Sequence, residues 1–100
     1  MGRIKNANET LILYFLWKNR TKWFLVSEIA RETMHPESTV RSILERYEKL
    51  GVVESSEEKF GKKWRFVPDV KNSAQALLFD HWFRLVSPLL DNLLKATSGV

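Results

Sequence analysis

The sequence predicts a mainly α-helical domain with a small β-hairpin, an α+β fold, that continues into a C-terminal helix. Apolar residues recur at intervals of three and four in four stretches, which is the spacing of amphipathic helices. Between the third and fourth stretches, two short segments have the strand-turn-strand pattern of a hairpin. The chain has 100 residues, 44% of them hydrophobic, which is enough for one packed domain.

The first helix is expected to follow residues 1–8, a polar segment that we assign to a flexible N-terminus. Asn8 or Thr10 can cap this helix, because both side chains accept hydrogen bonds from free backbone N–H groups. Leucine, isoleucine and aromatic residues give the helix an apolar stripe that ends near Lys18. The run Trp-Phe-Leu-Val at residues 23–26 then predicts a short β-strand.

The second and third helices are expected to be joined by a tight turn. The second helix runs from Ser27 to Met34. Pro36 suits the first position of the third helix, because proline lacks the N–H group that a helix start leaves unpaired. The third helix occupies residues 36–50, and Gly51 closes it, since glycine readily adopts the left-handed conformation of a C-cap.

The third helix has an apolar face and a polar face. The apolar face consists of Val40, Ile43, Leu44, Tyr47 and Leu50. The rest of the helix carries hydroxyls and cations, which are Ser38, Thr39, Arg41, Ser42, Arg46 and Lys49. Two acids, Glu37 and Glu45, accompany them and would repel a polyanion.

The hairpin is predicted from strands at residues 52–56 and 62–67, joined by a turn at residues 57–61. In the second strand, aromatic residues alternate with cations, which is the period of a half-buried strand. The cations Lys59, Lys62, Lys63 and Arg65 follow one another without an intervening acid. Pro68 ends the hairpin, so residues 9–68 form one domain.

Residues 69–96 predict a C-terminal helix, and residues 97–100 a tail. Ser87 followed by Pro88 is typical of a helix start. The segment is therefore either one helix kinked at Pro88 or two helices that meet there.

The apolar surface of this C-terminal segment is wider than one core requires. Its apolar residues include Leu78, Phe79, Trp82, Phe83, Val86, Leu89, Leu90 and Leu93. Because the rest of the domain already lines one core, the surplus apolar surface predicts a homodimer formed through residues 72–96.

Charge and composition exclude several classes of function. The formal net charge of +4 is concentrated in residues 1–25 and the hairpin, which suits a polyanionic partner. The chain has no cysteine, so disulfides and thiolate metal sites are excluded, and its two histidines make a zinc site improbable. The N-terminal residues predict no signal peptide, and no apolar run is long enough to span a membrane. We therefore expect a cytoplasmic protein.

Three short motifs and their spacing resemble the winged helix-turn-helix family of transcriptional regulators. The motifs are Ser27-Glu28-Ile29-Ala30, Ser38-Thr39-Val40 and Leu50-Gly51-Val52-Val53. They are similar to a pattern shared by the MarR-like, PadR-like and ArsR-like groups, and the resemblance covers about residues 9–67. The sequence departs from the family at Met34-His35, where such turns often hold glycine and then leucine or isoleucine, and at Tyr47, which replaces the usual leucine.

The resemblance implies sequence-specific binding of double-stranded DNA by a homodimeric transcriptional regulator, with no cofactor and no obligatory small molecule. The third helix would lie in the major groove, with the hairpin wing, residues 54–67, on the backbone or in the minor groove. The expected DNA-binding residues are Ser38, Thr39, Arg41, Ser42, Arg46, Lys49, Lys59, Lys62, Lys63 and Arg65. Arg41 and Ser42 are the candidates for base edges, and the others for phosphates.

Two alternatives remain open. A winged-helix module in a larger complex would bind another protein through the apolar C-terminal face, and Glu37 and Glu45 favour it. A sequence-independent architectural DNA-binding protein is a variant of the first hypothesis. An enzyme is not expected: His81 lies beside Asp80, but no nucleophile or glycine-rich loop accompanies the pair, so we predict no catalytic residue.

Overall fold

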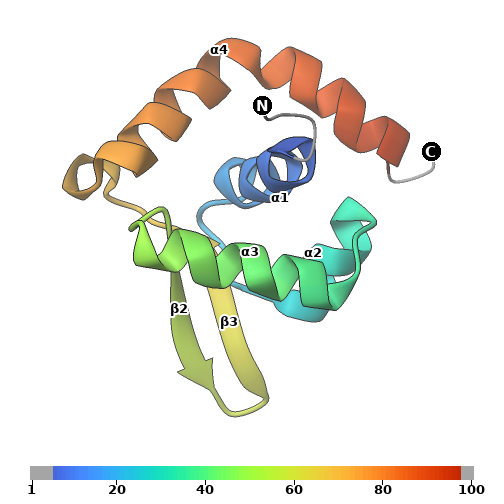
Figure 1. Ribbon diagram of the computed structural model, residues 1–100, viewed down its shortest axis with the longest axis vertical. Helices are drawn as coiled ribbons and strands as arrows, with labels where there is room; N and C mark the ends of the chain where they lie inside the picture. The colour runs from blue at the N-terminus through green and yellow to red at the C-terminus, as the bar shows by residue number, and fades with distance from the viewer. Residues whose placement is uncertain (1–5, 98–100) are drawn as a thin grey trace.

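The computed structural model describes residues 6–97, which contain four α-helices, a short 3-10 helix and three β-strands (Figure 1). In chain order they are α1 (Asn6–Lys18), β1 (Phe24–Leu25), α2 (Val26–Thr33), α3 (Glu37–Lys49), β2 (Val53–Glu58), β3 (Gly61–Phe66), η1 (Val70–Asn72) and α4 (Ala74–Thr97). The fold is mainly helical with a small antiparallel sheet, and the predicted α+β class is confirmed.

The sheet has the strand order β1-β3-β2, and both pairings are antiparallel. β2 and β3 pair from Val53–Phe66 to Glu58–Gly61, which leaves only Lys59 and Phe60 in the turn. This turn is shorter than the predicted one. Gly61, at φ 125°, occupies a backbone conformation that favours glycine. Figure 1 shows the β2–β3 hairpin projecting away from the helices.

The hydrophobic core lies between the helices and the inner face of the sheet. Its largest fully buried side chains are Tyr14, Phe66, Phe83, Ile12, Leu13, Leu16, Ile29, Leu44, Val40, Val52 and Val53. On β3, Trp64 and Phe66 point into this core, as the alternating pattern predicted. On α3, Val40, Ile43 and Leu44 are buried, whereas Leu50 is 45% exposed because the helix ends before it.

α1 begins at Asn6, so the helix includes residues 6–8, which the sequence assigns to a flexible N-terminus. The first turn of α1 is tied to α3 through Glu9, whose carboxylate accepts hydrogen bonds from Arg46 and from the Tyr47 hydroxyl. An acid in the first turn also interacts favourably with the helix dipole. Residues 1–5 of the predicted flexible segment and residues 98–100 of the predicted tail lie outside the described residues.

The turn between α2 and α3 is made by a residue in the left-handed conformation. Met34 has φ 59° and ψ 44°, and the following N–H group, that of His35, donates to the carbonyl of Ala30 at 3.0 Å. Glycine would adopt this conformation without a steric penalty, whereas an L side chain costs roughly 1–2 kcal/mol. Pro36 then directly precedes α3, one position earlier than predicted.

α4 is one continuous helix with Pro88 inside it, which decides between the two alternatives for the C-terminal segment. The helix arches over α1 in Figure 1 and bends on the way. Proline causes such a bend because it lacks the N–H of a helical hydrogen bond and its ring crowds the carbonyl one turn earlier.

α4 is capped by a serine that also touches the end of α3. The hydroxyl of Ser73 accepts a hydrogen bond from the N–H of Ala76 at 3.1 Å and donates one to the carbonyl of Leu50 at 2.9 Å. Gly51 lies against the same serine, and a Cβ at this glycine would meet two Ser73 side-chain atoms at 3.2 Å. The start of α4 is therefore held directly against the end of α3.

Candidate functional site

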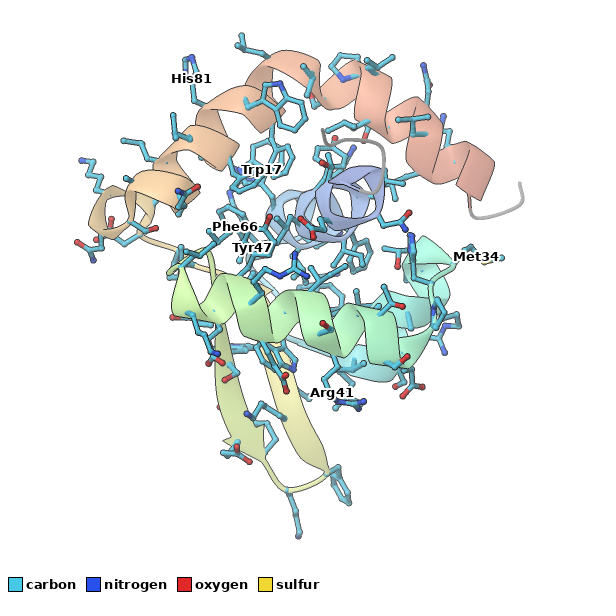
Figure 2. The ribbon with its side chains drawn as sticks, viewed as in Figure 1. Trp17, Met34, Arg41, Tyr47, Phe66 and His81 are labelled. Carbon is cyan, nitrogen blue, oxygen red and sulfur yellow. The ribbon has the colours of Figure 1, made fainter. Side chains whose placement is uncertain are left out.

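α3 presents its predicted contact residues on two different sides. Arg41 lines a groove between α3 and the hairpin, of about 400 Å³, which we call the hairpin groove. Ser38, Thr39, Ser42 and Arg46 line a second groove between α3 and the first turn of α1. Figure 2 shows Tyr47 directed towards α1 and Arg41 on the opposite edge of α3. The predicted residues therefore share one helix but do not converge on one pocket.

The hairpin groove has mixed charge. Besides Arg41, its lining includes Leu25, Val26, Ser27, Glu37, Glu45, Phe60, Gly61, Lys62 and Trp64. Two acids and two cations therefore line it together. A phosphate in this groove would meet attraction from Arg41 and Lys62 and repulsion from the two glutamates.

Arg46 forms an ion pair with Glu9 rather than standing free for a phosphate. The Glu9 side chain is only 17% exposed, and it also accepts a hydrogen bond from the Tyr47 hydroxyl at 2.8 Å. The hydrogen bond and the negative charge of Glu9 raise the pKa of Arg46. Burial, together with the hydrogen bond to Glu9, raises the pKa of Tyr47 to about 12. This three-residue cluster fixes α1 to α3.

Two of the four hairpin cations are paired across the strands. Glu54 faces Arg65 and Glu57 faces Lys62 in the β2–β3 register, and each pair forms a salt bridge. The guanidinium of Arg65 also lies over the ring of Trp23, 4.3 Å from its centre. These contacts hold the hairpin together and reduce the positive charge available to a polyanion.

Four cations on this side of the molecule remain without an acidic partner among residues 6–97. They are Arg41, Lys49, Lys59 and Lys63. Sequence reasoning could not separate them from the paired cations. The acids that pair with Lys62 and Arg65 are identified only by the strand register, and the acid that pairs with Arg46 lies 37 residues away.

The two apolar rows of α4 have different surroundings. Phe83 and Leu90 are buried in the core of the chain itself, and Phe79 and Val86 pack partly buried against it. The core of the chain itself therefore takes up Phe83 and Leu90. Phe79 and Val86 remain partly exposed, and Phe79 lines a pocket with Leu78 and Trp82. The other row is solvent-exposed and consists of Leu78, Trp82, Leu85, Leu89 and Leu93, between 43% and 68% exposed. We call these five residues the outer row.

Hydrogen bonds from α1 to aspartates fix which row of α4 faces inward. The Tyr14 hydroxyl donates to Asp91 at 2.6 Å, and the Trp17 indole N–H donates to Asp80 at 2.8 Å. Hydrogen bonds from Lys18 and Tyr14 lower the pKa of Asp91. Burial opposes ionisation of Asp80, but the hydrogen bonds from Trp17 and Arg84 outweigh it and lower the pKa.

The Asp80 and His81 side chains have different surroundings. The Asp80 carboxylate is bonded to Trp17 and Arg84, whereas His81 is exposed and points away from α1 in Figure 2. Within residues 6–97, no three histidine or acidic side chains lie close enough together to hold a metal ion. None of the helices described combines the length and the apolar character that crossing a membrane requires.

One exposed residue at the end of the hairpin was missed by the sequence reasoning. Phe60 is 87% exposed and occupies the second position of the two-residue turn. The available signal was a phenylalanine between a lysine and a glycine in a predicted turn, where a polar residue is usual.

A scan against protein-family models finds no match, and searches of the curated proteins and of the solved structures find none either.

Proposed function

We propose that this chain is a winged helix-turn-helix protein that binds double-stranded DNA sequence-specifically, with α3 in the major groove. The observation that carries the proposal is the position of α3. Its apolar side is buried, α2 precedes it after a tight turn, and the hairpin follows it directly. The exposed side of α3 carries hydroxyls and cations, and an α-helix is narrow enough to enter the major groove.

The unpaired cations give this proposal a specific division of roles. Arg41 is the best candidate for a base edge, because arginine donates two parallel hydrogen bonds to guanine. Lys49, Lys59 and Lys63 contact phosphates, with Ser38 and Thr39 at the N-terminus of α3. Arg46, Lys62 and Arg65 contribute less than the sequence suggests, because each is already paired with a glutamate.

We further propose that two copies associate through the outer row of α4. The spacing 78, 82, 85 and 89 is that of residues in a helix–helix seam. All five side chains are large and apolar, so a second copy of the same row can cover them in an isologous contact. Five large apolar side chains exposed to water do not stabilise the monomer. An exposed apolar patch of this kind is typical of an interaction surface.

Selection of bound sequences from a pool of random duplexes tests the DNA-binding proposal. We expect enrichment of a two-fold symmetric site, with affinity that decreases as salt increases. Arg41→Ala should reduce discrimination at one base pair by about 1–3 kcal/mol. Arg31→Ala is the matched control, because Arg31 is exposed and lines neither groove beside α3. Recovery of no enriched sequence would contradict the proposal.

A second candidate function is a protein–protein module with the same fold. The specific observation in its favour is the pairing of three predicted DNA contacts with acids, together with Glu37 and Glu45 beside Arg41. This alternative predicts weak binding to random duplex with little salt dependence. An architectural DNA-binding protein would instead bind with salt dependence but without a preferred sequence.

A further inference from the structure

The end of the β2–β3 hairpin carries a large apolar side chain that the fold does not use. Phe60 is 87% exposed, the highest value among the large hydrophobic residues whose exposure is described. The ammonium of Lys59 lies 6.0 Å from the centre of its ring. Single exposed apolar residues are common, so exposure alone does not indicate a function. The observations that do indicate a function are the shape, charge and position of the hairpin tip.

The tip is narrow and held in shape. The turn contains two residues, and paired strands are about 4.8 Å apart. The minor groove of B-DNA is about 6 Å wide, so a single side chain at the turn can enter it, whereas an α-helix of about 10–12 Å cannot. The cross-strand salt bridges Glu54–Arg65 and Glu57–Lys62 support the hairpin behind the tip. The Phe60 ring therefore lies at the end of a paired β-hairpin rather than on an irregular loop.

The charge around the tip suits a polyanion. Lys59, Lys62 and Lys63 lie within five residues, and residues 59–63 contain no acid. Of the two acids before the turn, Glu57 is paired with Lys62, and Glu58 accepts a hydrogen bond from Ser56 at 2.7 Å. Among residues 6–97, Lys59 and Lys63 have no acidic partner. Phosphates beside the tip would therefore find cations in the turn and on β3, whereas the charged residues of β2 are all acids.

The tip lies on the same side of the molecule as the candidate base contact. Phe60 and Arg41 both line the hairpin groove. If α3 occupies the major groove, the projecting hairpin reaches the neighbouring minor groove of the same duplex.

Building on the proposed function, we propose that Phe60 enters the minor groove as an apolar wedge, partly separates two stacked base pairs and bends the duplex. Wedges of this kind unstack a base step and bend DNA by about 20–90°. Pyrimidine–purine steps unstack most easily, so the position beneath the tip should favour TA or CA/TG steps. Phe60 therefore contributes to sequence preference without reading a base edge.

The test uses the full chain and a short duplex taken from the sequences that the wild-type protein selects out of random DNA. Dyes at the two ends of the duplex report bending by energy transfer, and a titration at several salt concentrations gives affinity and salt dependence. Phe60→Ala should lower affinity roughly tenfold, remove the bend and leave the salt dependence unchanged. Phe60→Trp should retain both the affinity and the bend. Lys59→Ala is the matched control in the same turn: it should reduce the salt slope by about one and keep the bend.

The results distinguish failure of this inference from failure of the proposed function. If the wild type binds its selected duplex but does not bend it, or if Phe60→Ala bends it equally, the wedge is wrong and DNA binding stands. If the wild type selects and binds no duplex at any salt concentration, both proposals are wrong. Binding to vesicles of anionic lipid that is lost in Phe60→Ala, without binding to duplex, would also overturn the wedge. Phe60→Ala should unfold at the same midpoint temperature as the wild type, because the ring lies outside the core. This measurement checks that the variant folds.

Discussion

The two apolar rows of α4 are similar in composition and opposite in environment. The inner row contains Phe83 and Leu90, which are at most 5% exposed, and the outer row contains Leu85 and Leu89, which are more than 60% exposed. Both rows repeat at helical spacing and both extend across Pro88. The difference is made by α1, which offers aromatic rings and hydrogen-bond donors to the inner row only.

This comparison teaches that hydrophobicity alone does not assign a helix face to the core. Asp80 and Asp91 lie about three helical turns apart on one flank of the inner row, and each meets a donor from α1. Apolar contact and directional hydrogen bonds together select one row for the core, and the other row remains exposed. Four predictions test this distinction.

The largest effect is expected from truncating the inner row. Phe83→Ala should lower the free energy of unfolding by about 3–5 kcal/mol, because the ring is fully buried and a cavity would replace it. Its centre lies 5.3 Å from that of Tyr14 and 5.5 Å from that of Phe79. Denaturant unfolding measures the change. An effect below 1 kcal/mol would mean that the inner row is not part of the core.

A slightly smaller effect is expected on association from charging the outer row. Leu85→Asp combined with Leu89→Asp should weaken the homodimer about a hundredfold, since charged side chains would replace leucines in the proposed contact. Sedimentation over a range of concentrations measures the dissociation constant, and circular dichroism checks that the helices persist. A wild-type protein that is monomeric at high concentration would contradict the proposed dimer.

The aspartates should make stability depend on acid pH. The pKa of Asp91 is lowered in the folded protein, so its contribution is present above the unfolded pKa of about 3.9 and is lost as pH falls through the folded value. Asp91→Asn should cost about 1 kcal/mol at pH 7, a modest value because solvent reaches the side chain. Its unfolding free energy should also fall less than that of the wild type between pH 5 and pH 2. Parallel pH profiles would exclude this role.

The smallest effect is expected from truncating one outer-row residue in the monomer. Leu78→Ala, introduced into the variant that carries Leu85→Asp and Leu89→Asp, should change the free energy of unfolding by less than about 0.5 kcal/mol. Leu78 is 65% exposed, so its removal leaves no cavity in the core. Chemical unfolding of the two variants side by side gives the difference. A loss comparable to that of Phe83→Ala would show that the two rows do not differ as described.

The elements that depend on local chemistry were predictable from the sequence. Pro36 and Gly51 mark the two ends of α3, and the alternation around Trp64 identifies β3. The fourth helix was expected, although the sequence allowed two helices at Pro88. A proline inside a helix is tolerated here because the inner row holds both halves against the core.

Features that depend on distant partners were not predictable. Arg46 resembles a phosphate contact in the sequence, but Glu9, which neutralises it, lies in another helix. The first turn of α1 depends on the same contact, because Glu9 anchors it to α3. In the sequence alone, residues 6–8 have the composition of a polar tail. The roles of Lys62 and Arg65 depend on the strand register, which in turn depends on a turn of two residues rather than five. Tertiary pairing, rather than residue type, decides which cations remain available.

In the proposed dimer, the contact between Ser73 and the end of α3 would also determine the distance between the two DNA half-sites that the subunits contact. In a dimer joined through α4, the separation of the two α3 helices depends on the angle at which α4 leaves α3. That angle is fixed where Ser73 bonds the carbonyl of Leu50 and packs on Gly51. Successive half-sites must lie about one helical turn of DNA apart for both helices to enter the same face. Under the two proposals, the spacer length that a DNA site can tolerate would therefore be set at this joint, which adjoins Lys49 at the end of α3 and lies outside the outer row of α4.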